Sequence, residues 1–181
     1  MARQIHPFEQ LKQLAQRVRD QAVPLPEKTG KDNSWQAIAF HLDDATLLID
    51  MNSVSEVSPQ PPVTRLPGVK RWVLGISNVR GEVLAIVDLH EFFELGGTRN
   101  PQQNRIIAIE RGDIRLGMVV DRVIGMRQVS TQDIRSQASD KCPEPMKLCV
   151  SGSVLIDNQW MDIFDPEKLI NNENFLSVST L

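Results

Sequence analysis

The stretch Leu66–Leu95, LPGVKRWVLGISNVRGEVLAIVDLHEFFEL, decides the fold of this chain. A glycine-containing pair between two apolar runs is typical of a hairpin turn, so the residues on either side of Arg80-Gly81 are predicted to be paired strands. Asp88 follows the second run at the position of a helix N-cap, and Glu91 stands three residues later. We therefore predict a strand, a tight turn, a second strand and a short capped helix.

The same pattern returns near the C-terminus, in the segment SGSVLIDNQWMDIFDPEKLI of residues 151–170. The spacing from Gly75 to Asp88 equals the spacing from Gly152 to Asp165, and each interval holds a turn pair at the same offset. Each aspartate is followed by residues that start a helix, so both are better explained as helix caps than as catalytic acids. This internal repeat predicts two similar subdomains.

The two copies of the repeat differ at the turn. Asp157 stands where Arg80 stands in the first copy, and Leu155 stands where Asn78 stands. If the fold alone determined these positions, similar residues would suffice in both copies. The turn of the first copy is therefore a candidate for a special role, although an exposed turn whose Arg80 pairs with an acid such as Glu56 explains it equally well.

Composition limits the class of function. The chain has 181 residues, 41% of them hydrophobic, with a net charge of −3 and interleaved acids and bases. Binding to nucleic acid requires a concentrated basic surface, so nucleic acid is not an expected partner. No apolar run approaches the length of a membrane span, no secretory leader is recognisable, and a cytoplasmic protein without membrane insertion is expected. Cys142 and Cys149 lack the spacing of a metal or redox motif, and two reduced thiols are favoured over a disulfide between them.

The N-terminal part is predicted to be an arm outside the main domain. Apolar residues recur at three- and four-residue steps from Phe8 to Ala22, which predicts an amphipathic helix. Such a helix packs on its own domain or docks on a partner, and short helices more often gain stability by packing at home. A linker rich in proline and glycine, residues 24–33, follows. We expect residues 1–33 to be arm and linker, and residues 34–181 to form the domain.

From Trp35 onward, short apolar segments alternate with turn residues, which predicts an all-β class with minor helices. The runs Val83–Val87 and Ile106–Ile109 are continuous, as is typical of strands covered on both faces. The segment Val123–Val129 is predicted to continue the sheet formed by the strand before it, and Asn52–Val57 to bend or bulge.

Sequence marks of catalysis and of cofactor binding are missing. The three histidines are scattered, and no spacing typical of zinc ligands, of a nucleophile elbow or of a phosphate-binding loop is present. We therefore expect no enzyme activity, no metal and no cofactor.

The motif Asn78-Val79-Arg80-Gly81, followed by Val87-Asp88-Leu89, resembles the N-L-R-G…(V/I)-D-L core of the CheW family. Members of this family are adaptors that link chemoreceptors to the CheA histidine kinase. The resemblance runs from Trp35 to Ile170 and includes Pro67, Trp72, Gly75, Gly117–Asp121 and Ile163–Asp165. It is greatest to the branch of the family that serves twitching motility by type IV pili.

The resemblance implies two intertwined five-stranded SH3-like barrels with a hydrophobic seam, and no catalysis. It implies two partners, the regulatory domain of a CheA-like histidine kinase and the cytoplasmic hairpin tip of a chemoreceptor. Glu56 and Arg80 match family positions that are expected to pair near a partner-binding surface. The partner-binding residues implied in this way are Val54, Glu56, Gly75, Asn78, Arg80 and Gly81, with Leu47, Ile49 and Ile106 expected to approach a receptor groove.

Two other functions stay open on the residues alone. A sensor could use the groove between the barrels as a small-molecule pocket. An enzyme without recognisable motifs would show convergent histidine or carboxylate groups in one cleft. The sequence favours the adaptor over both.

Overall fold

The computed structural model describes residues 33–96 and 102–180. These belong to one compact unit, Asn33–Leu181. The predicted helix Phe8–Ala22 and nearly all of the predicted linker lie outside the described residues. Among the described helices, none combines the length and the apolar character that a membrane span requires.

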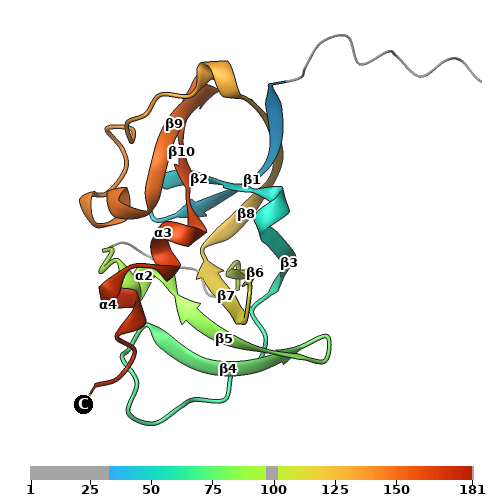
Figure 1. The fold of residues 1–181 in the computed structure, drawn as a ribbon, viewed down its shortest axis with the longest axis vertical. Coiled ribbons are helices and arrows are strands. Elements are labelled where there is room, and N and C mark those ends of the chain that lie inside the picture. Colours follow the sequence, from blue (N-terminus) through green and yellow to red (C-terminus); the bar gives the residue numbers. More distant parts are fainter. Residues whose placement is uncertain (1–32, 97–101, 181) are drawn as a thin grey trace, which may run out of the picture. The chain divides into compact units, whose positions relative to one another are not determined.

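Ten strands form two antiparallel-rich sheets of five strands each (Figure 1). Sheet A has the order β8-β1-β2-β10-β9, and sheet B has the order β3-β6-β7-β5-β4. The strands of sheet A are β1 (Ser34–Leu42), β2 (Ala45–Asp50), β8 (Arg122–Ser130), β9 (Val150–Ile156) and β10 (Gln159–Phe164). The strands of sheet B are β3 (Val54–Pro59), β4 (Val73–Val79), β5 (Glu82–Asp88), β6 (Arg105–Arg111) and β7 (Ile114–Val120). The mostly β fold class with two five-stranded units is confirmed.

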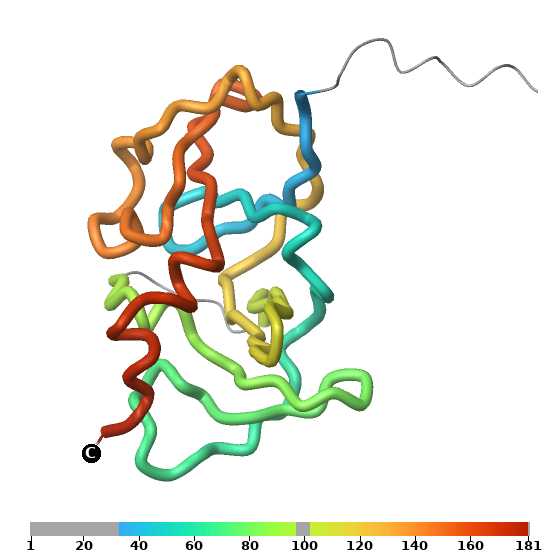
Figure 2. The backbone as a smooth tube through the Cα atoms, in the orientation of Figure 1, coloured from blue at the N-terminus to red at the C-terminus, as the bar shows by residue number. Residues whose placement is uncertain are grey.

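The two sheets are related by a circular permutation. Reading β3 to β7 in chain order gives the same spatial arrangement as reading β8, β9, β10, β1 and β2. Each sheet holds one parallel pair at the same place, β5 with β7 and β10 with β2. Figure 2 shows the consequence: β3 to β7, from the middle of the chain, build one subdomain, and the strands before and after them, β1, β2 and β8 to β10, build the other. The subdomains are intertwined, as predicted, because the strands of sheet A come from before and after the strands of sheet B along the chain.

One sequence-based expectation about the strands is wrong. The segment Val123–Val129 was expected to continue the sheet of the strand before it, but β8 pairs with β1 in sheet A whereas β7 belongs to sheet B. The chain changes sheets at Asp121, whose backbone N–H donates to the carbonyl of His41. A one-residue crossover between sheets leaves no mark in the apolar pattern, because apolar residues occur in β7 before the crossover and again in β8 after it, although β8 is much more exposed.

Three apolar cores hold the unit together. One lies within sheet A and includes Ala39, Leu48 and Val154, and a second lies within sheet B and includes Ile86 and Ile106. The third and largest, here called the seam core, draws residues from both sheets. Its members include Phe40, Leu47, Ile49, Val87, Ile107, Ile109, Met118, Val120 and Phe164.

Strand β6 shows how the cores are connected. Ile107 and Ile109 enter the seam core, whereas Ile106 and Ala108 enter the core of sheet B, because successive side chains point to opposite faces. All four are buried, so the prediction for this run is confirmed. The same prediction for Val83–Val87 holds for Leu84, Ile86 and Val87 but not for Val83 and Ala85, which are exposed.

Short helices close the strand-turn-strand units. The helix α2 (Leu89–Phe92) follows β5, and the carboxylate of Asp88 accepts from the backbone N–H groups of His90 and Glu91 at 3.0 and 3.3 Å. The helix α3 (Pro166–Ile170) follows β10, and Asp165 accepts from the N–H of Glu167 at 3.0 Å. The predicted caps are confirmed.

The remaining helices are short. Three are 3-10 helices, η1 (Met51–Ser53), η2 (Thr131–Asp133) and η3 (Glu144–Cys149). The last, α4 (Glu173–Leu176), places Phe175 against Trp72, with ring centroids 5.0 Å apart and the rings stacked. It ties the end of the chain to sheet B.

The two equivalent glycines have the same structural task. Gly75 in β4 has φ +137°, and a Cβ there would lie 2.0 Å from the carbonyl oxygen of Thr64. A Cβ on Gly152 in β9 would lie 2.3 Å from the carbonyl oxygen of Arg135. In each case the crossing segment forms an isolated bridge with the strand, Thr64 with Ile76 and Arg135 with Ser153. Both glycines let a second chain segment approach the edge strand.

Gly75→Ala is expected to destabilise the protein by roughly 2–4 kcal/mol, because the added methyl meets backbone atoms and the left-handed conformation is strained. Gly68→Ala is the matched control: its φ is +70°, but nothing lies within 4 Å of the added Cβ. That variant carries only the conformational cost, about 1 kcal/mol. Urea unfolding measures the free energy of unfolding of both variants. Equal losses in the two would show that the close approach of Thr64 is not what requires glycine at position 75.

The cysteines are free and buried, as predicted. Burial raises the pKa of each thiol to about 12, from a usual 9.0, with the charges of Asp162 beside Cys142 and Asp165 beside Cys149 adding to the effect. Both thiols are therefore neutral in the folded protein over the whole physiological range.

Because the folded pKa is higher than the unfolded pKa, the two thiols contribute stability that is present below pH 9 and is lost as the pH rises toward 12. Between about pH 8 and pH 10.5 the loss should be on the order of 2 kcal/mol per thiol. The double variant Cys142→Ser/Cys149→Ser should lose less stability over the same interval in urea unfolding. Parallel losses in the two proteins would contradict a role for the thiols.

Candidate partner-binding site

The turn between β4 and β5 has a defined geometry. Arg80 and Gly81 have φ values of +52° and +90°, the left-handed conformation of a two-residue hairpin turn. The side-chain oxygen of Asn78 accepts from the backbone N–H of Gly81 at 2.9 Å. Asn78 and Gly81 therefore shape the turn, and the special role assigned to them has a local structural explanation. The residue that the turn presents to solvent is Arg80.

Arg80 and Glu56 form the ion pair that the resemblance implied. Arg80 Nε lies 3.2 Å from Glu56 Oε1, with the arginine side chain 79% exposed and the glutamate side chain 14% exposed. Strands β3 and β4 are the two edges of sheet B, so this pair joins the hairpin turn at one edge to the strand at the other. Glu56 acts as a half-buried anchor that directs an exposed guanidinium.

The second subdomain cannot form this pair. Asp157 occupies the position of Arg80, with φ +50° in an equivalent turn. Glu56 pairs with Ala108 in β6, and the matching residue in sheet A is Gly125, which pairs with Ala39 in β1. Both partners of the ion pair are thus absent from the other copy, although the backbone geometry is the same. The fold does not require the pair.

An apolar strip lies beside the turn. Val83, Ala85 and Val87 share one face of β5, and Val87 is in the seam core whereas Val83 is 58% exposed. On β7, Leu116 is in the seam core and Ile114 is 41% exposed. The face of sheet B that packs on sheet A therefore continues past it as an open apolar surface.

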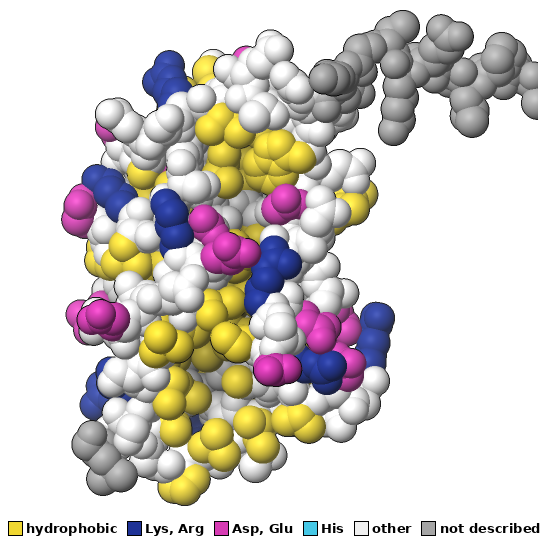
Figure 3. All heavy atoms as spheres, viewed as in Figure 1, with side chains coloured by type: hydrophobic (Ala, Val, Ile, Leu, Met, Phe, Trp, Pro, Cys, Tyr) yellow, Lys and Arg dark blue, Asp and Glu magenta, His cyan; other side chains and the backbone are white. Residues whose placement is uncertain are grey.

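We define the hairpin-end surface as Glu56, Ile76, Arg80, Val83 and Ile114. Ile76 belongs to it because it pairs with Ala85 across the hairpin and is only half-buried. Figure 3 shows charged side chains gathered at the hairpin end, with apolar side chains next to them over the same subdomain. Arg115 adds to the charged group through ion pairs with Glu110 at 3.1 Å and Glu82 at 3.5 Å.

Three sequence-predicted contact residues are corrected by the structure. Leu47, Ile49 and Ile106 were expected to approach a receptor groove, but each has 0% exposure. Leu47 and Ile49 are members of the seam core, and Ile106 of the core of sheet B. Residues inside a closed core offer no atoms to a partner, so they support the site only by packing.

Two further predicted residues have supporting positions. Gly75 is buried behind Thr64, so its role is to let that segment cross β4. Val54 is half-buried at the edge of the seam core, at the bulge of β3. Sequence reasoning missed Val83 and Ile114, because an apolar residue in a strand is expected to be covered. The signal that could have found Ile114 is its position directly after the Arg111–Asp113 turn.

Among the described residues, another kind of site would need converging ionisable groups or an open cavity. No group of three or more histidine, cysteine, aspartate or glutamate side chains gathers there in a way that could hold a metal ion. The space between the sheets is occupied by the seam core, and a hollow of about 220 Å³ lies at its rim, lined by Ser53, Arg111 and Glu167 among others. Arg111 Nη2 there donates to Ser53 Oγ at 2.7 Å, and Arg111 Nε lies 3.6 Å from Glu167 Oε1.

Comparison with known proteins gives a consistent assignment. Residues 36–174 match the model of the CheW-like domain. The chain is 34% identical to protein PilI of Pseudomonas aeruginosa over 96% of both chains. It is 24% identical to chemotaxis protein CheW of Thermotoga maritima, over 75% of this chain and 87% of that one. It is 32% identical to protein FrzA of Myxococcus xanthus over 52% of this chain and 59% of that one.

The fold has a match among solved structures. The scaffolding protein TtCheW of Thermoanaerobacter tengcongensis superposes with a TM-score of 0.67 at 21% identity, over 80% of this chain and 99% of that one. At this identity the likeness concerns the fold. Taken with the domain match over residues 36–174, it is decisive: the chain belongs to the CheW family of chemotaxis adaptors.

Proposed function

We propose that this protein is a non-catalytic adaptor that couples a chemoreceptor to a CheA-like histidine kinase, in the pathway that controls type IV pili. The observation that carries the proposal is the hairpin-end surface. Its ion pair occurs in one subdomain only, on a backbone that both subdomains share. A feature that the fold does not need, and that stands in solvent beside an apolar strip, is best explained by a partner.

The chemistry of this surface suits protein recognition. Arg80 Nε lies 3.2 Å from Glu56 Oε1, and the arginine side chain is 79% exposed, so its guanidinium nitrogens are accessible to a partner. Those nitrogens can donate to carboxylates or carbonyls of a partner in a fixed geometry. Val83 and Ile114 add apolar area that is lost from water on binding. Arginine is one of the residue types that are enriched at interaction hot spots.

The coupling itself would be mechanical. An adaptor that holds receptor and kinase in one geometry lets a change in the receptor bias the conformations of the kinase. The seam core supports this role, because it joins the two sheets through interdigitated, fully buried side chains such as Phe40 and Met118. A close-packed interior transmits a displacement at one surface to another.

The kinase contact is assigned to the regulatory domain of the kinase, and the receptor contact to the hairpin tip of its cytoplasmic coiled coil. Similarity to PilI along almost the whole chain favours the pilus pathway over a flagellar one. We expect the protein to act in the cytoplasm and to be recruited to receptor arrays at the membrane.

The kinase contact can be tested by calorimetry with the purified regulatory domain of the CheA-like kinase from the same bacterium. The native protein is expected to bind with micromolar affinity, and Arg80→Glu to weaken binding by about tenfold or more while the circular-dichroism spectrum is unchanged. Asp157→Lys is the matched control, because it changes charge at the equivalent turn of the other subdomain. Equal affinity of Arg80→Glu and the native protein would contradict the proposed contact.

The pathway makes a separate prediction. Deleting the gene in the source bacterium should abolish surface spreading by twitching, and a plasmid copy should restore it. A copy that carries Arg80→Glu should restore less spreading than one that carries Asp157→Lys at equal protein level. Normal twitching of the deletion strain would place the adaptor in another pathway.

A further inference from the structure

The segment from Val57 to Gly81 contains no acidic residue, although the whole chain has a net charge of −3. It contains four cations, of which Arg80 is paired with Glu56. The other three are Arg65, Lys70 and Arg71. Within residues 33–96 and 102–180, these three side chains form no ion pair. The segment is therefore a local excess of positive charge.

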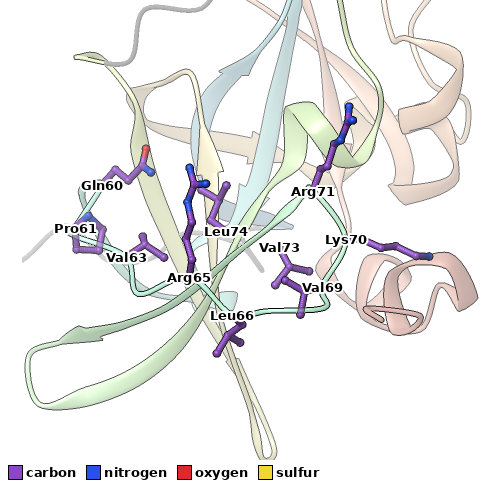
Figure 4. Close-up of a pocket in the computed structure, with 10 residues that line it drawn as sticks. All are labelled: Gln60, Pro61, Val63, Arg65, Leu66, Val69, Lys70, Arg71, Val73 and Leu74. Carbon is purple, nitrogen blue, oxygen red and sulfur yellow. The ribbon is translucent and has the colours of Figure 1, made fainter. Parts of the chain in front are cut away.

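These cations line a hollow together with aliphatic side chains. The hollow has a volume of about 480 Å³, and its lining includes Val63, Leu66, Val69, Val73 and Leu74 next to Gln60, Pro61 and the three cations. Figure 4 shows Arg65 and Arg71 extending in the same direction, while Lys70 extends toward the C-terminal helices. Leu66 is 39% exposed at the rim. The volume lies in the range of sites that take a few side chains of a ligand.

The hollow is held in shape by backbone hydrogen bonds on both sides. Thr64 and Ile76 exchange two bonds of 2.8 and 2.9 Å. On the other side, the N–H of Lys70 donates to the carbonyl of Val178, and the N–H of Thr180 donates to the carbonyl of Gly68, at 2.9 and 3.0 Å. A loop fixed at both ends loses little conformational freedom when it binds. The cations are thus presented by a preformed site.

We propose that this hollow is a second docking site, which binds an acidic peptide segment of a partner protein that inserts an aliphatic side chain. Charge complementarity with Arg65 and Arg71 selects the acidic flanks of the segment, and the aliphatic side chains of Val63, Val69 and Val73 select the aliphatic anchor. A membrane surface fits less well, because a flat bilayer contacts protruding residues and cannot enter a recess. The site shares no residue with the hairpin-end surface, so one adaptor can engage two partner segments at once.

The test measures binding of the full chain to a fluorescein-labelled peptide, EELDELEELD, by fluorescence anisotropy. The matched peptide QQLNQLQQLN keeps the aliphatic residues and removes the charge. Binding of the acidic peptide should exceed binding of the neutral one, and should fall when NaCl is raised from about 50 to about 500 mM, because exposed charges are screened. The double variant Arg65→Glu/Arg71→Glu should weaken binding by about tenfold or more.

Three controls make the result specific. Arg122→Glu/Lys141→Glu makes the same change of charge at exposed cations elsewhere in the chain and should leave binding unchanged. Leu66→Gln should weaken the binding of the acidic peptide relative to the native protein, because the aliphatic anchor of the peptide enters the hollow beside Leu66. Vesicles of phosphatidylglycerol and phosphatidylcholine test the membrane alternative by co-sedimentation.

Binding of the vesicles that depends on Arg65 and Arg71, without peptide binding, would overturn the proposal in favour of a lipid surface. Equal weakening by both double variants, or binding of neither peptide, would also overturn it. Because the hairpin-end surface is tested by Arg80→Glu and the hollow by other residues, failure of one proposal leaves the other standing.

Discussion

The seam core is the interaction on which the rest of this structure depends. Each sheet has a small core of its own, but the largest apolar cluster lies between them and draws side chains from strands and helices of both. Phe40 of β1 and Phe164 of β10 meet there edge to face, with ring centroids 6.1 Å apart. Burying one such side chain fully contributes about 1.5–3 kcal/mol. Since each subdomain buries one face of its sheet in the seam, neither subdomain presents a complete hydrophobic interior by itself.

The duplicated unit separates what the fold needs from what it does not. Both copies have a left-handed turn pair, an aspartate that caps a helix, and a glycine that lets another segment cross an edge strand. These shared features are backbone constraints, and they recur because the same strand arrangement was built twice. The pair of Arg80 with Glu56 is different, because the equivalent positions hold Asp157 and Gly125. Solvent exposure and asymmetry together point to recognition at that end of sheet B.

Sequence patterns were reliable where the signal is local. The hairpin turns, both helix caps, the bulge of β3 and the burial of Ile106–Ile109 follow from residues that are close along the chain. They failed where the outcome depends on which sheet covers a strand. Val83 and Ile107 lie in similar apolar runs, yet one is open to solvent and the other is buried. Leu47 and Ile49 failed as contact residues for the same reason, since a family position says nothing about exposure in this chain.

The sequence by itself determined the repeat, the β class, the family and the turn residues that differ between the copies, because spacing and turn chemistry are properties of short segments. Only the tertiary structure decided that β8 leaves the sheet of β7, that Arg80 reaches an anchor 24 positions earlier in the chain at Glu56, and that Arg65, Lys70 and Arg71 line one hollow. Each of these depends on contacts between segments that are distant in sequence. Such contacts are fixed by the burial of apolar area across the seam, which no local pattern encodes.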